Sequence, residues 1–436
     1  MVGRKANLLT MEAHQAHESQ LLSQFSGKGD LPTGGITIVS ALVTFGRNRM
    51  AYTALKSLSR RGIKVVAGDS FSPSMCFYSR YCHGRFVYPS PYLYPERFIE
   101  TLARKAREFG CRVLMPMHEE GFIIARYRDR LTPVLKVPLP DYDQIMTLHS
   151  KDRFYALAQQ LGIPIPKTYH VGQIEELEEI ADELSYPAVV KPRRAHGAFG
   201  LRYVNSSREL KEAYGELTSR FGFQPEDAPV IQEYVAGAKH SVCMLYNRGK
   251  LRAKFTFKFL REFPIEGGTA VLRTSVRNDA MEQIAHQVLE RLEWHGIAEA
   301  EFTLTEDRGP VLMEINPRFW GSLYQGVASG VDFPYLLYRM AVDGDVDPVL
   351  EYPLGVKTRW LWGDWRALCD YLRRPISQHR VLLDYLKFFR RDTSYDDFAL
   401  EDPLPFVVEM IYPFVCLITR GTFNPVERGS EYDRGN

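Results

Sequence analysis

The sequence has little cysteine and no arrangement of cysteines that would pair them or bind zinc. Six cysteines are scattered over 436 residues, and none belongs to a Cys-x-x-Cys pair or a zinc-finger spacing. A large chain with so little cysteine is typical of a reducing compartment, which predicts a cytoplasmic protein. The N-terminal residues also lack the apolar core of a signal peptide, so we interpret residues 1–33 as a flexible N-terminal tail.

The sequence also has no large excess of one charge and no hydrophobic run long enough to span a bilayer. The formal net charge is +2, which argues against a nucleic-acid partner. The most apolar segment, residues 405–420, is interrupted by Glu409 and by prolines. We interpret this segment as a C-terminal helix packed on the core. Contact with a membrane surface or with a second copy in a homodimer is the less favoured alternative.

Length and patterning predict about three domains. In residues 34–135, β-branched runs alternate with helical patterns, which predicts a small, doubly wound, Rossmann-like α/β domain. Strands with intervening helices dominate residues 136–345, and we expect an α+β catalytic domain there. Residues 346–436 are rich in tryptophan and arginine and are interpreted as a mostly helical C-terminal extension.

The local patterns give a coarse set of elements. A turn at 247–249 is expected to join two strands. The expected helices are 51–61, 98–109, 119–128, 151–161, 206–221 and 279–293. The expected strands are 36–43, 63–67, 112–115, 187–191, 230–234, 241–246, 251–259, 296–304 and 310–315.

Three oxygen ligands lie on the last two of these strands, which are expected to form a hairpin. Glu301 lies on the first strand, and Glu314 and Asn316 lie on or next to the second. Two facing carboxylates repel one another unless a cation lies between them, and hard oxygen ligands suit Mg²⁺. Arg318 follows and offers a planar set of donors for phosphate or carboxylate. The pattern predicts a metal–nucleotide site, and solvent-facing strand carboxylates are the alternative.

Two lysines are candidates for binding phosphate. Lys191 ends a buried apolar strand, where a lysine is costly unless an anion meets it. A loop with His196, Gly197 and Gly200 follows, and its glycines allow a close approach of the backbone to a phosphate. An ordinary turn with a surface lysine is the alternative. Lys151 lies in the first turn of a helix, which a bound phosphate would explain, as would plain exposure.

Three further groups of residues are weaker candidates. Residues 232–235 form a strand end whose backbone suits an adenine edge, although an amphipathic edge strand fits them equally well. Arg273 follows a glycine pair that we interpret as a flexible turn, and it is a candidate substrate or phosphate clamp or else a salt-bridged surface residue. Residues 44–48 and 118–120 follow strands of the first domain, where such sheets bind ligands, but helix capping explains them too.

Together these residues resemble the ATP-grasp superfamily over about residues 34–345. The resemblance is closest to its carbamoyl-phosphate-synthase-like and carboxylate–amine ligase branches. Its most specific elements are Glu301-Phe302 and the run 314–318, followed by Val189-Val190-Lys191-Pro192. Where many relatives carry a second glutamate for the ribose, this sequence has His240, as some carboxylase-type relatives do.

The resemblance implies a role for each matching position. The implied metal ligands are Glu301, Glu314 and Asn316, for Mg²⁺ with Mn²⁺ as the alternative ion. The implied catalytic residues are Lys191, Arg273 and Arg318. The implied ATP-binding residues are Lys151, Lys191, His196, Gly197, Gly200, Gln232, Glu233, Tyr234, Val235 and His240.

The implied activity is an ATP-dependent ligase that activates a small-molecule carboxylate as an acyl phosphate and couples it to an amine, releasing ADP and phosphate. The first step depends on positioning and charge neutralisation more than on covalent help from the protein. Two other functions remain open. One is phosphorylation of a carboxylate or bicarbonate without amide formation, and the other is a nucleotide-binding scaffold without turnover.

Overall fold

A computed structural model of the chain describes residues 41–171, 176–192, 200–221, 228–265, 267–373, 385 and 393–423. These residues belong to one compact unit, Ile38–Asn436. The expected tail, residues 1–33, and the loop residues His196 and Gly197 lie outside the described residues.

The first domain is a parallel sheet with helices on both faces, as predicted. Its strands are in the order β3-β2-β1-β4. The strands are β1 (Ala41–Val43), β2 (Val65–Asp69), β3 (Gly84–Val87) and β4 (Val113–Met115). The helices are α2 (Arg49–Arg60), η1 (Met75–Tyr78), α3 (Pro95–Phe109), α4 (Glu120–Arg126) and η2 (Arg128–Arg130). Alternation along β1 shows the two faces: Val43 packs in the same core as Leu55 of α2, whereas Leu42 packs with Phe98 of α3.

A small antiparallel sheet, in the order β5-β8-β6-β7, has a hydrophobic core of its own. Its strands are β5 (Thr168–His170), β6 (Ala188–Lys191), β7 (Arg202–Val204) and β8 (Val230–Glu233). Helices α7 (Glu176–Glu183) and α8 (Ser207–Phe221) pack against it. Leu177 and Leu210 from the helices meet Val190 and Ile231 from the strands. The sequence analysis did not predict β5, β7 or α7.

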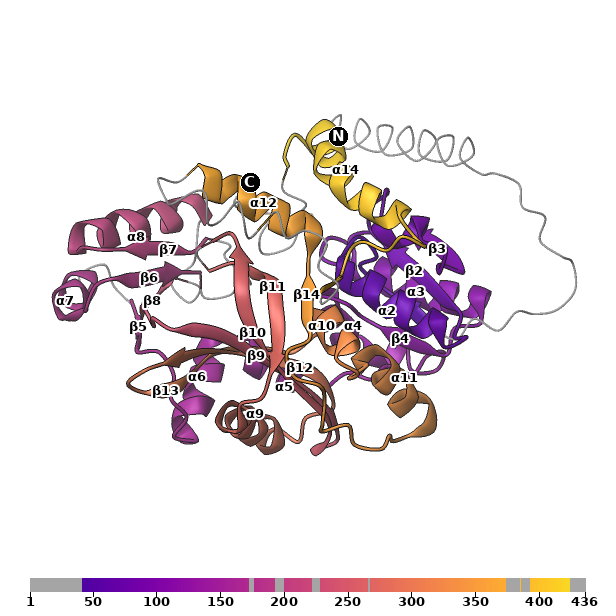
Figure 1. The fold of residues 1–436 in the computed structure, drawn as a ribbon, viewed down its shortest axis with the longest axis horizontal. Coiled ribbons are helices and arrows are strands. Elements are labelled where there is room, and N and C mark those ends of the chain that lie inside the picture. Colours follow the sequence, from indigo (N-terminus) through magenta and orange to yellow (C-terminus); the bar gives the residue numbers. More distant parts are fainter. Residues whose placement is uncertain are drawn as a thin grey trace, which may run out of the picture. The chain divides into compact units, whose positions relative to one another are not determined.

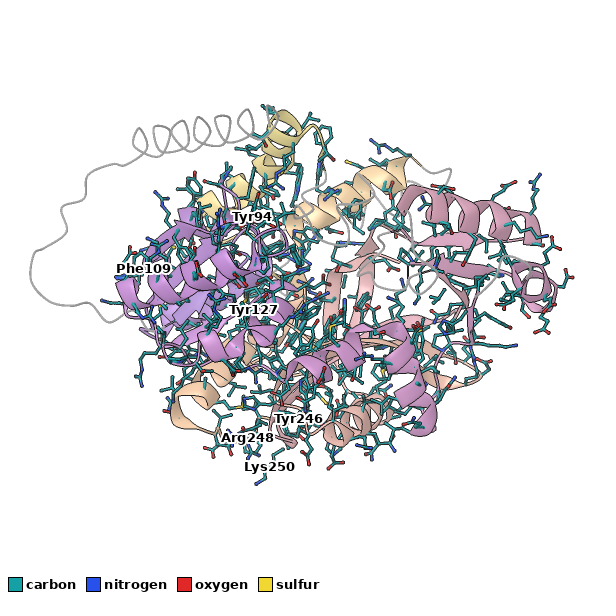
Figure 2. All side chains as sticks on the ribbon, turned by 180° about the vertical axis from the view of Figure 1, so that it is seen from behind. Tyr94, Phe109, Tyr127, Tyr246, Arg248 and Lys250 are labelled. Atoms are coloured by element: carbon teal, nitrogen blue, oxygen red, sulfur yellow. The ribbon has the colours of Figure 1, made fainter. Side chains whose placement is uncertain are left out.

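The largest sheet has seven strands in the order β13-β12-β9-β10-β11-β14-β15. They are β9 (Ala238–Asn247), β10 (Lys250–Phe263), β11 (Thr269–Val276), β12 (Gly296–Thr305), β13 (Gly309–Asn316), β14 (Lys357–Arg359) and β15 (Thr393–Tyr395). The helices around it are α5 (Tyr142–His149), α6 (Lys151–Gln160), α9 (Asp279–Arg291), α10 (Leu323–Ala328) and α11 (Phe333–Asp343). The predicted turn at 247–249 joins β9 to β10, and Figure 2 shows Tyr246, Arg248 and Lys250 at this end of the sheet.

Alternation along β12 directs its side chains to two different environments. Ala298 and Ala300 pack in the core with Met281 of α9. Glu299 and Glu301 therefore point to the opposite face of the same strand. This antiparallel hairpin of β12 and β13 is the one that the sequence predicted.

The C-terminal region contains two helices, α12 (Leu361–Leu372) and α14 (Leu404–Arg420), and the second of them is the helix predicted at 405–420. It also contains β14 and β15, which the sequence analysis did not predict and which extend the seven-stranded sheet beyond β11 (Figure 1). Helix α14 lies over the first domain and contacts η1 (Figure 1). Just before α14, the Asp402 carboxylate accepts hydrogen bonds from Tyr52 at 3.1 Å and from Ser79 at 2.5 Å.

Helix α14 has two different faces. Tyr412 and Cys416 are buried against the protein, which agrees with a helix packed on the core. Phe414 and Ile418 are exposed on the other side. Within the part of the chain that the structure describes, no helix is long and apolar enough to cross a membrane.

Candidate active site

The acidic residues of the β12–β13 hairpin converge on one face of the sheet. In the antiparallel register Glu301 lies directly opposite Glu314, and Glu299 lies opposite Asn316. The Asn316 side-chain amide donates to Glu301 Oε1 at 3.0 Å and to Glu299 Oε2 at 3.3 Å. The four side chains therefore form one polar group, which we call the acidic cluster.

The electrostatics of the acidic cluster favour a cation. Burial raises the pKa of Glu301 well above its ordinary value, and the charges of Glu314 and Glu299 raise it further. Burial raises the pKa of Glu299 to about 7, against the opposing effect of Arg318. A divalent ion between these groups would remove the repulsion and the cost of burial. The residues present, carboxylates and an amide oxygen, are the donor types that Mg²⁺ takes.

The acidic cluster is not a complete protein cage for a metal. Among the described residues, no group of three or more His, Cys, Asp or Glu side chains has the arrangement of a metal site. Mg²⁺ commonly uses one or two protein carboxylates and completes its shell with phosphate and water. The cluster therefore fits an ion that arrives with a phosphate ligand.

Both predicted phosphate-binding lysines face the acidic cluster. Lys151 begins α6 and Lys191 ends β6, and both line the same pocket as Glu301 and Glu314. Burial lowers the pKa of each lysine, and the Glu314 charge partly offsets this for both. Lys191 Nζ lies 3.5 Å from the Tyr155 hydroxyl. Buried or half-buried cations opposite half-buried anions, with space between them, suit a ligand that carries phosphates and a metal.

The pocket continues from the lysines to residues 232–235, the hinge segment, and it is lined there by apolar side chains. These are Val189, Leu201, Phe259, Phe302 and Met313. A flat, apolar slot beside a strand end is suited to a purine ring. Gly200 follows the loop segment that lies outside the described residues, and its φ is +68°. It lies against Pro192, and a Cβ added to Gly200 would come within 2.7 Å of the proline ring. Gly200 therefore supports the local backbone and does not itself line the pocket.

The side chains of the hinge segment already have partners. Gln232 donates to the Tyr155 hydroxyl and to Thr168 Oγ1, both at 2.8 Å. The Glu233 carboxylate accepts from Arg308 at 2.8 Å and from the Lys167 backbone N–H at 2.9 Å. A nucleotide at this place would use the backbone of 234–235 or displace one of these partners, so a direct role for the Glu233 carboxylate would require it to leave Arg308 or the Lys167 N–H.

His240 lines the pocket from β9, as expected for a ribose neighbour. Its Nδ1 lies 2.9 Å from the Ala238 carbonyl oxygen, and burial lowers its pKa, so the imidazole is neutral at pH 7. Sequence reasoning missed the adjacent Lys239, which also lines the pocket and pairs with Glu262 at 2.5 Å. Only the pairing of β9 with β10 and β12 brings Lys239 here, and no local signal marks it.

Arg318 connects the acidic cluster with the first domain. Its guanidinium donates to Asn316 Oδ1 at 3.1 Å, and its Nε lies 4.0 Å from Glu119 Oε1. His118 stacks on Phe45 with their ring centroids 4.8 Å apart. The loops after β1 and β4 therefore meet beside Arg318, as their position at strand carboxyl ends suggested.

Glu120, in contrast, supports the loop structure. Its Oε1 accepts from the Thr44 hydroxyl at 2.6 Å and from the Met117 backbone N–H at 3.0 Å. Burial raises the pKa of Glu120, although these hydrogen bonds oppose the rise. We therefore interpret Glu120 as a residue that ties the two loops together and not as a helix cap, since α4 has no side-chain cap.

The interpretation of Arg273 as a substrate or phosphate clamp is wrong, although the glycine pair before it does lie between β10 and β11. Arg273 itself lies on strand β11 and is 0% exposed. Its guanidinium donates to Thr358 Oγ1 at 2.8 Å and to the Ala270 carbonyl at 2.7 Å, and it pairs with Asp396. Arg273 therefore ties β11 to β14 and to the segment after β15. These partners are distant from Arg273 in the sequence, so the local pattern did not indicate them.

Residues 149–322 match the family model of the ATP-grasp domain. The chain contains an ATP-grasp domain. The matched range lies inside the expected region 136–345 and includes Lys151, Lys191 and the whole acidic cluster.

Relatives of known name support the ATP-grasp assignment. The carbamoyl phosphate synthase large chain of Sulfurisphaera tokodaii is 23% identical over 229 residues, which cover 51% of this chain and 20% of the relative. The D-alanine–D-alanine ligase of Mycobacterium ulcerans is 29% identical over 198 residues, 38% of this chain and 48% of that one. The chain thus spans about a fifth of the first relative and about half of the second.

A solved structure shows that the fold extends beyond the ATP-grasp domain. The biotin carboxylase domain of Hydrogenobacter thermophilus 2-oxoglutarate carboxylase, in complex with MgADP, ADP and bicarbonate, superposes with a TM-score of 0.58. The identity is 16%, and the match covers 74% of each chain. At this identity the likeness establishes the fold.

Proposed function

We propose that this protein is an ATP- and Mg²⁺-dependent ligase that activates a substrate carboxylate as an acyl phosphate and couples it to an amine. The observation that carries the proposal is the position of Glu301 and Glu314 opposite Lys151 and Lys191 in one pocket. Binding a nucleotide base alone would not require paired acids facing paired lysines. The similarity to a D-alanine–D-alanine ligase supports the amine-coupling step.

The chain's own residues have separate tasks in this proposal. Lys151 and Lys191 bind the phosphates and neutralise their charge. Glu301, Glu314 and Asn316 would hold Mg²⁺, which supplies further charge neutralisation when bound. Arg318 lies next to Asn316 and reaches toward the first domain, so it is suited to orient the acid at the point of phosphoryl transfer.

The second candidate is phosphorylation of a carboxylate or bicarbonate without amide formation. The similarities to a carbamoyl phosphate synthase and to a carboxylase domain crystallised with bicarbonate favour this alternative. In both cases we propose small-molecule substrates, ATP with Mg²⁺ or Mn²⁺, and a cytoplasmic location, with a homodimer as the assembly to test.

The decisive experiment measures ADP release over a panel of carboxylic acids, each with and without a panel of amines. Release that requires both an acid and an amine, with a coupled product in the mass spectrum, supports the ligase. Release with an acid alone, unaffected by any amine, supports the second candidate. A complete lack of acid-stimulated release would contradict both.

Glu314→Ala links the activity to the acidic cluster. We expect it to abolish Mg²⁺-dependent ADP release in a folded protein. Glu306→Ala is a matched control, because Glu306 lies in the exposed turn of the same hairpin. Near-normal release by Glu314→Ala would show that the metal assignment is wrong.

A further inference from the structure

Arg49 is a buried arginine whose guanidinium does not use all of its hydrogen-bond donors within the described part of the protein. It is the first residue of α2 and is 7% exposed. Its Nε and Nη2 atoms have no hydrogen-bond partner among the residues that the structure describes. A buried guanidinium without hydrogen bonds costs free energy, so an incompletely satisfied one is a candidate for binding an anion.

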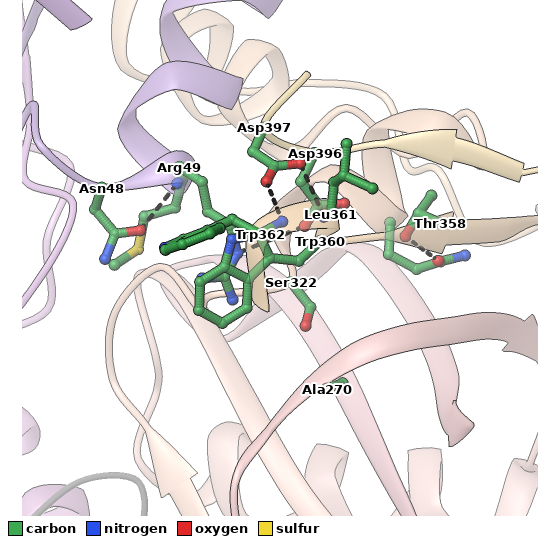
Figure 3. Close-up of polar contacts among 12 residues, drawn as sticks. Asn48, Arg49, Ala270, Ser322, Thr358, Trp360, Leu361, Trp362, Asp396 and Asp397 are labelled. Carbon is green, nitrogen blue, oxygen red and sulfur yellow. Dashed lines mark hydrogen bonds and ion pairs between the residues drawn. The ribbon is translucent and has the colours of Figure 1, made fainter. Parts of the chain in front are cut away.

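The position of Arg49 is fixed by Trp360. The guanidinium lies over the indole, 3.7 Å from the ring centroid (Figure 3). Trp360 Nε1 in turn donates to Glu409 Oε1 at 2.9 Å. Gly363 leaves the space for the indole, since an added Cβ there would come within 2.2 Å of the ring. Arg49 is thus held by a rigid support from α12 and α14, as a preorganised binding group would be.

The carboxylates near Arg49 are only partly engaged by other groups, because Asp396 Oδ1 and Glu409 Oε2 are buried without a hydrogen-bond partner among the described residues. Asp396 Oδ2 is 3.6 Å from Arg49 Nε, but the same oxygen accepts from Arg273. Both Asp397 oxygens accept from backbone N–H groups at the start of α12, at 3.0 and 2.9 Å (Figure 3). Burial, together with the charge of Asp397, raises the pKa of Glu409 well above its ordinary value, which favours its neutral form. Burial, together with the charge of Arg273, lowers the pKa of Arg49, and the charges of the nearby acids oppose this change.

Arg49 lies directly behind the wall of the central pocket at Gly321. An added Cβ on Gly321 would be 2.7 Å from Arg49 Nη2 and 3.6 Å from Thr269 Oγ1. Gly321, Ser322 and Thr269 line the same pocket as the lysines and the acidic cluster. Glycine at 321 is therefore what lets the guanidinium come this close to the pocket.

We propose that Arg49 is a specificity residue that binds a second anionic group of the substrate acid, at the Gly321 side of the pocket. The preferred substrate is then a dicarboxylic acid, with one carboxylate at the phosphoryl-transfer site and the other on Arg49. A planar guanidinium is suited to a carboxylate because it can donate two parallel hydrogen bonds. The reaction of the dicarboxylic acid rests on the proposed function. Its binding to Arg49 does not.

The first test measures binding without turnover, as the thermal shift of the full chain. The probes are malonate, succinate and glutarate, each against the monocarboxylate of equal chain length, and 3-phosphonopropionate as the phosphate-like arm. We expect the wild-type protein to be stabilised more by at least one dicarboxylate than by its monocarboxylate. Arg49→Gln should lose this difference, and Arg60→Gln should keep it, because Arg60 is an exposed residue of the same helix. A larger shift with the phosphonate than with every dicarboxylate would overturn the choice of carboxylate.

The second test separates a binding role from a purely structural one. With an accepted acid, Arg49→Lys should raise the KM for the dicarboxylate by about 10- to 100-fold and leave the KM for ATP unchanged. Gly321→Ala should act in the same direction, because its Cβ would displace the Arg49 guanidinium. Both variants keep the charge of Arg49, so the test does not depend on the stability of Arg49→Gln.

Two results would overturn the inference. One is equal stabilisation of the wild-type protein by dicarboxylates and monocarboxylates. The other is a lowered melting temperature in the Arg49 variants with an unchanged preference among acids, which would assign Arg49 a structural role only. If no acid stimulates ADP release, the proposed function fails, whereas the thermal shifts still decide whether Arg49 binds a dicarboxylate.

Discussion

Glu301 and Glu314 lie directly opposite one another across the β12–β13 ladder, on the face of the sheet that also meets Lys191. Two like charges at this separation are unfavourable in the absence of a cation. The repulsion between the two carboxylates therefore destabilises the folded protein in the absence of ligands. It is removed when a divalent ion and a phosphate enter the pocket.

Removing one of these charges should weaken the stabilisation of the protein by metal and nucleotide. In EDTA, we expect Glu314→Gln to unfold at a urea concentration equal to or above that of the wild-type protein. With Mg²⁺ and a non-hydrolysable ATP analogue at about 100 times its Kd, the wild-type protein should gain about 2.7 kcal/mol, and the variant much less. Equal gains in both proteins would contradict the metal assignment, and EDTA should remove the wild-type gain.

Lys191→Met tests whether the buried lysine is present for a ligand. The protein alone does not compensate the cost of burial, which lowers the pKa of Lys191. We expect the variant to be at least as stable as the wild-type protein without nucleotide, and to bind the ATP analogue at least about tenfold more weakly, the loss of one charge-assisted contact. Calorimetric titration measures the affinity. Lys250→Met, an exposed lysine in the β9–β10 turn, is the control and should change neither quantity.

Arg273 should be important for stability and not for nucleotide binding. Arg273→Met would leave the buried Asp396 carboxylate without its closest partner, and we expect a loss of about 3–5 kcal/mol in the free energy of unfolding. Urea unfolding measures this loss, and titration with the ATP analogue at low temperature checks that affinity is retained. A variant with normal stability but no ADP release would restore the original interpretation of Arg273 as a clamp.

Asp397 should give part of the stability a specific pH dependence. Burial raises its pKa from an ordinary 3.8 to about 6 in the folded protein. Between these two values the folded state binds more protons at this group than the unfolded state, so its contribution to stability falls as pH rises from about 4 to 6. The free energy of unfolding should therefore show a less negative slope in Asp397→Asn over this window. The exposed Asp129→Asn should follow the wild-type curve, and an identical slope in all three proteins would contradict the prediction.

The sequence predicted those parts of the site that are encoded by local pattern. Glu301 and Glu314 lie on strands whose apolar flanking residues and connecting turn can be recognised in the sequence. A hairpin with this turn places both side chains on the same face. Lys191 was found because a lysine inside an apolar strand is unusual. The doubly wound first domain followed from the alternation of short strands and helices, although the short β3 was missed.

The remainder depends on contacts between distant parts of the chain. Arg273 and Asp396 are separated by 123 residues, and nothing near Arg273 indicates that its partner lies after β15. Strands β14 and β15 have three mainly polar residues each and therefore carry no apolar pattern, unlike β4, which is equally short but entirely apolar. The proximity of Arg49 to Gly321 could not be predicted either, because it depends on the packing of α2 against the loop after β13.

The addition of β14 and β15 to the seven-stranded sheet has a consequence for how the protein is made. Until residues 357–359 have left the ribosome, β11 remains an edge strand with unpaired backbone groups, and β14 is the edge strand until residues 393–395 follow. A nascent chain halted soon after residue 345 would already contain every acid and lysine of the pocket, and it would still present that open edge to its neighbours. Synthesis of the last stretch covers that edge, and we expect it to reduce the association of the seven-stranded sheet with other unfinished chains.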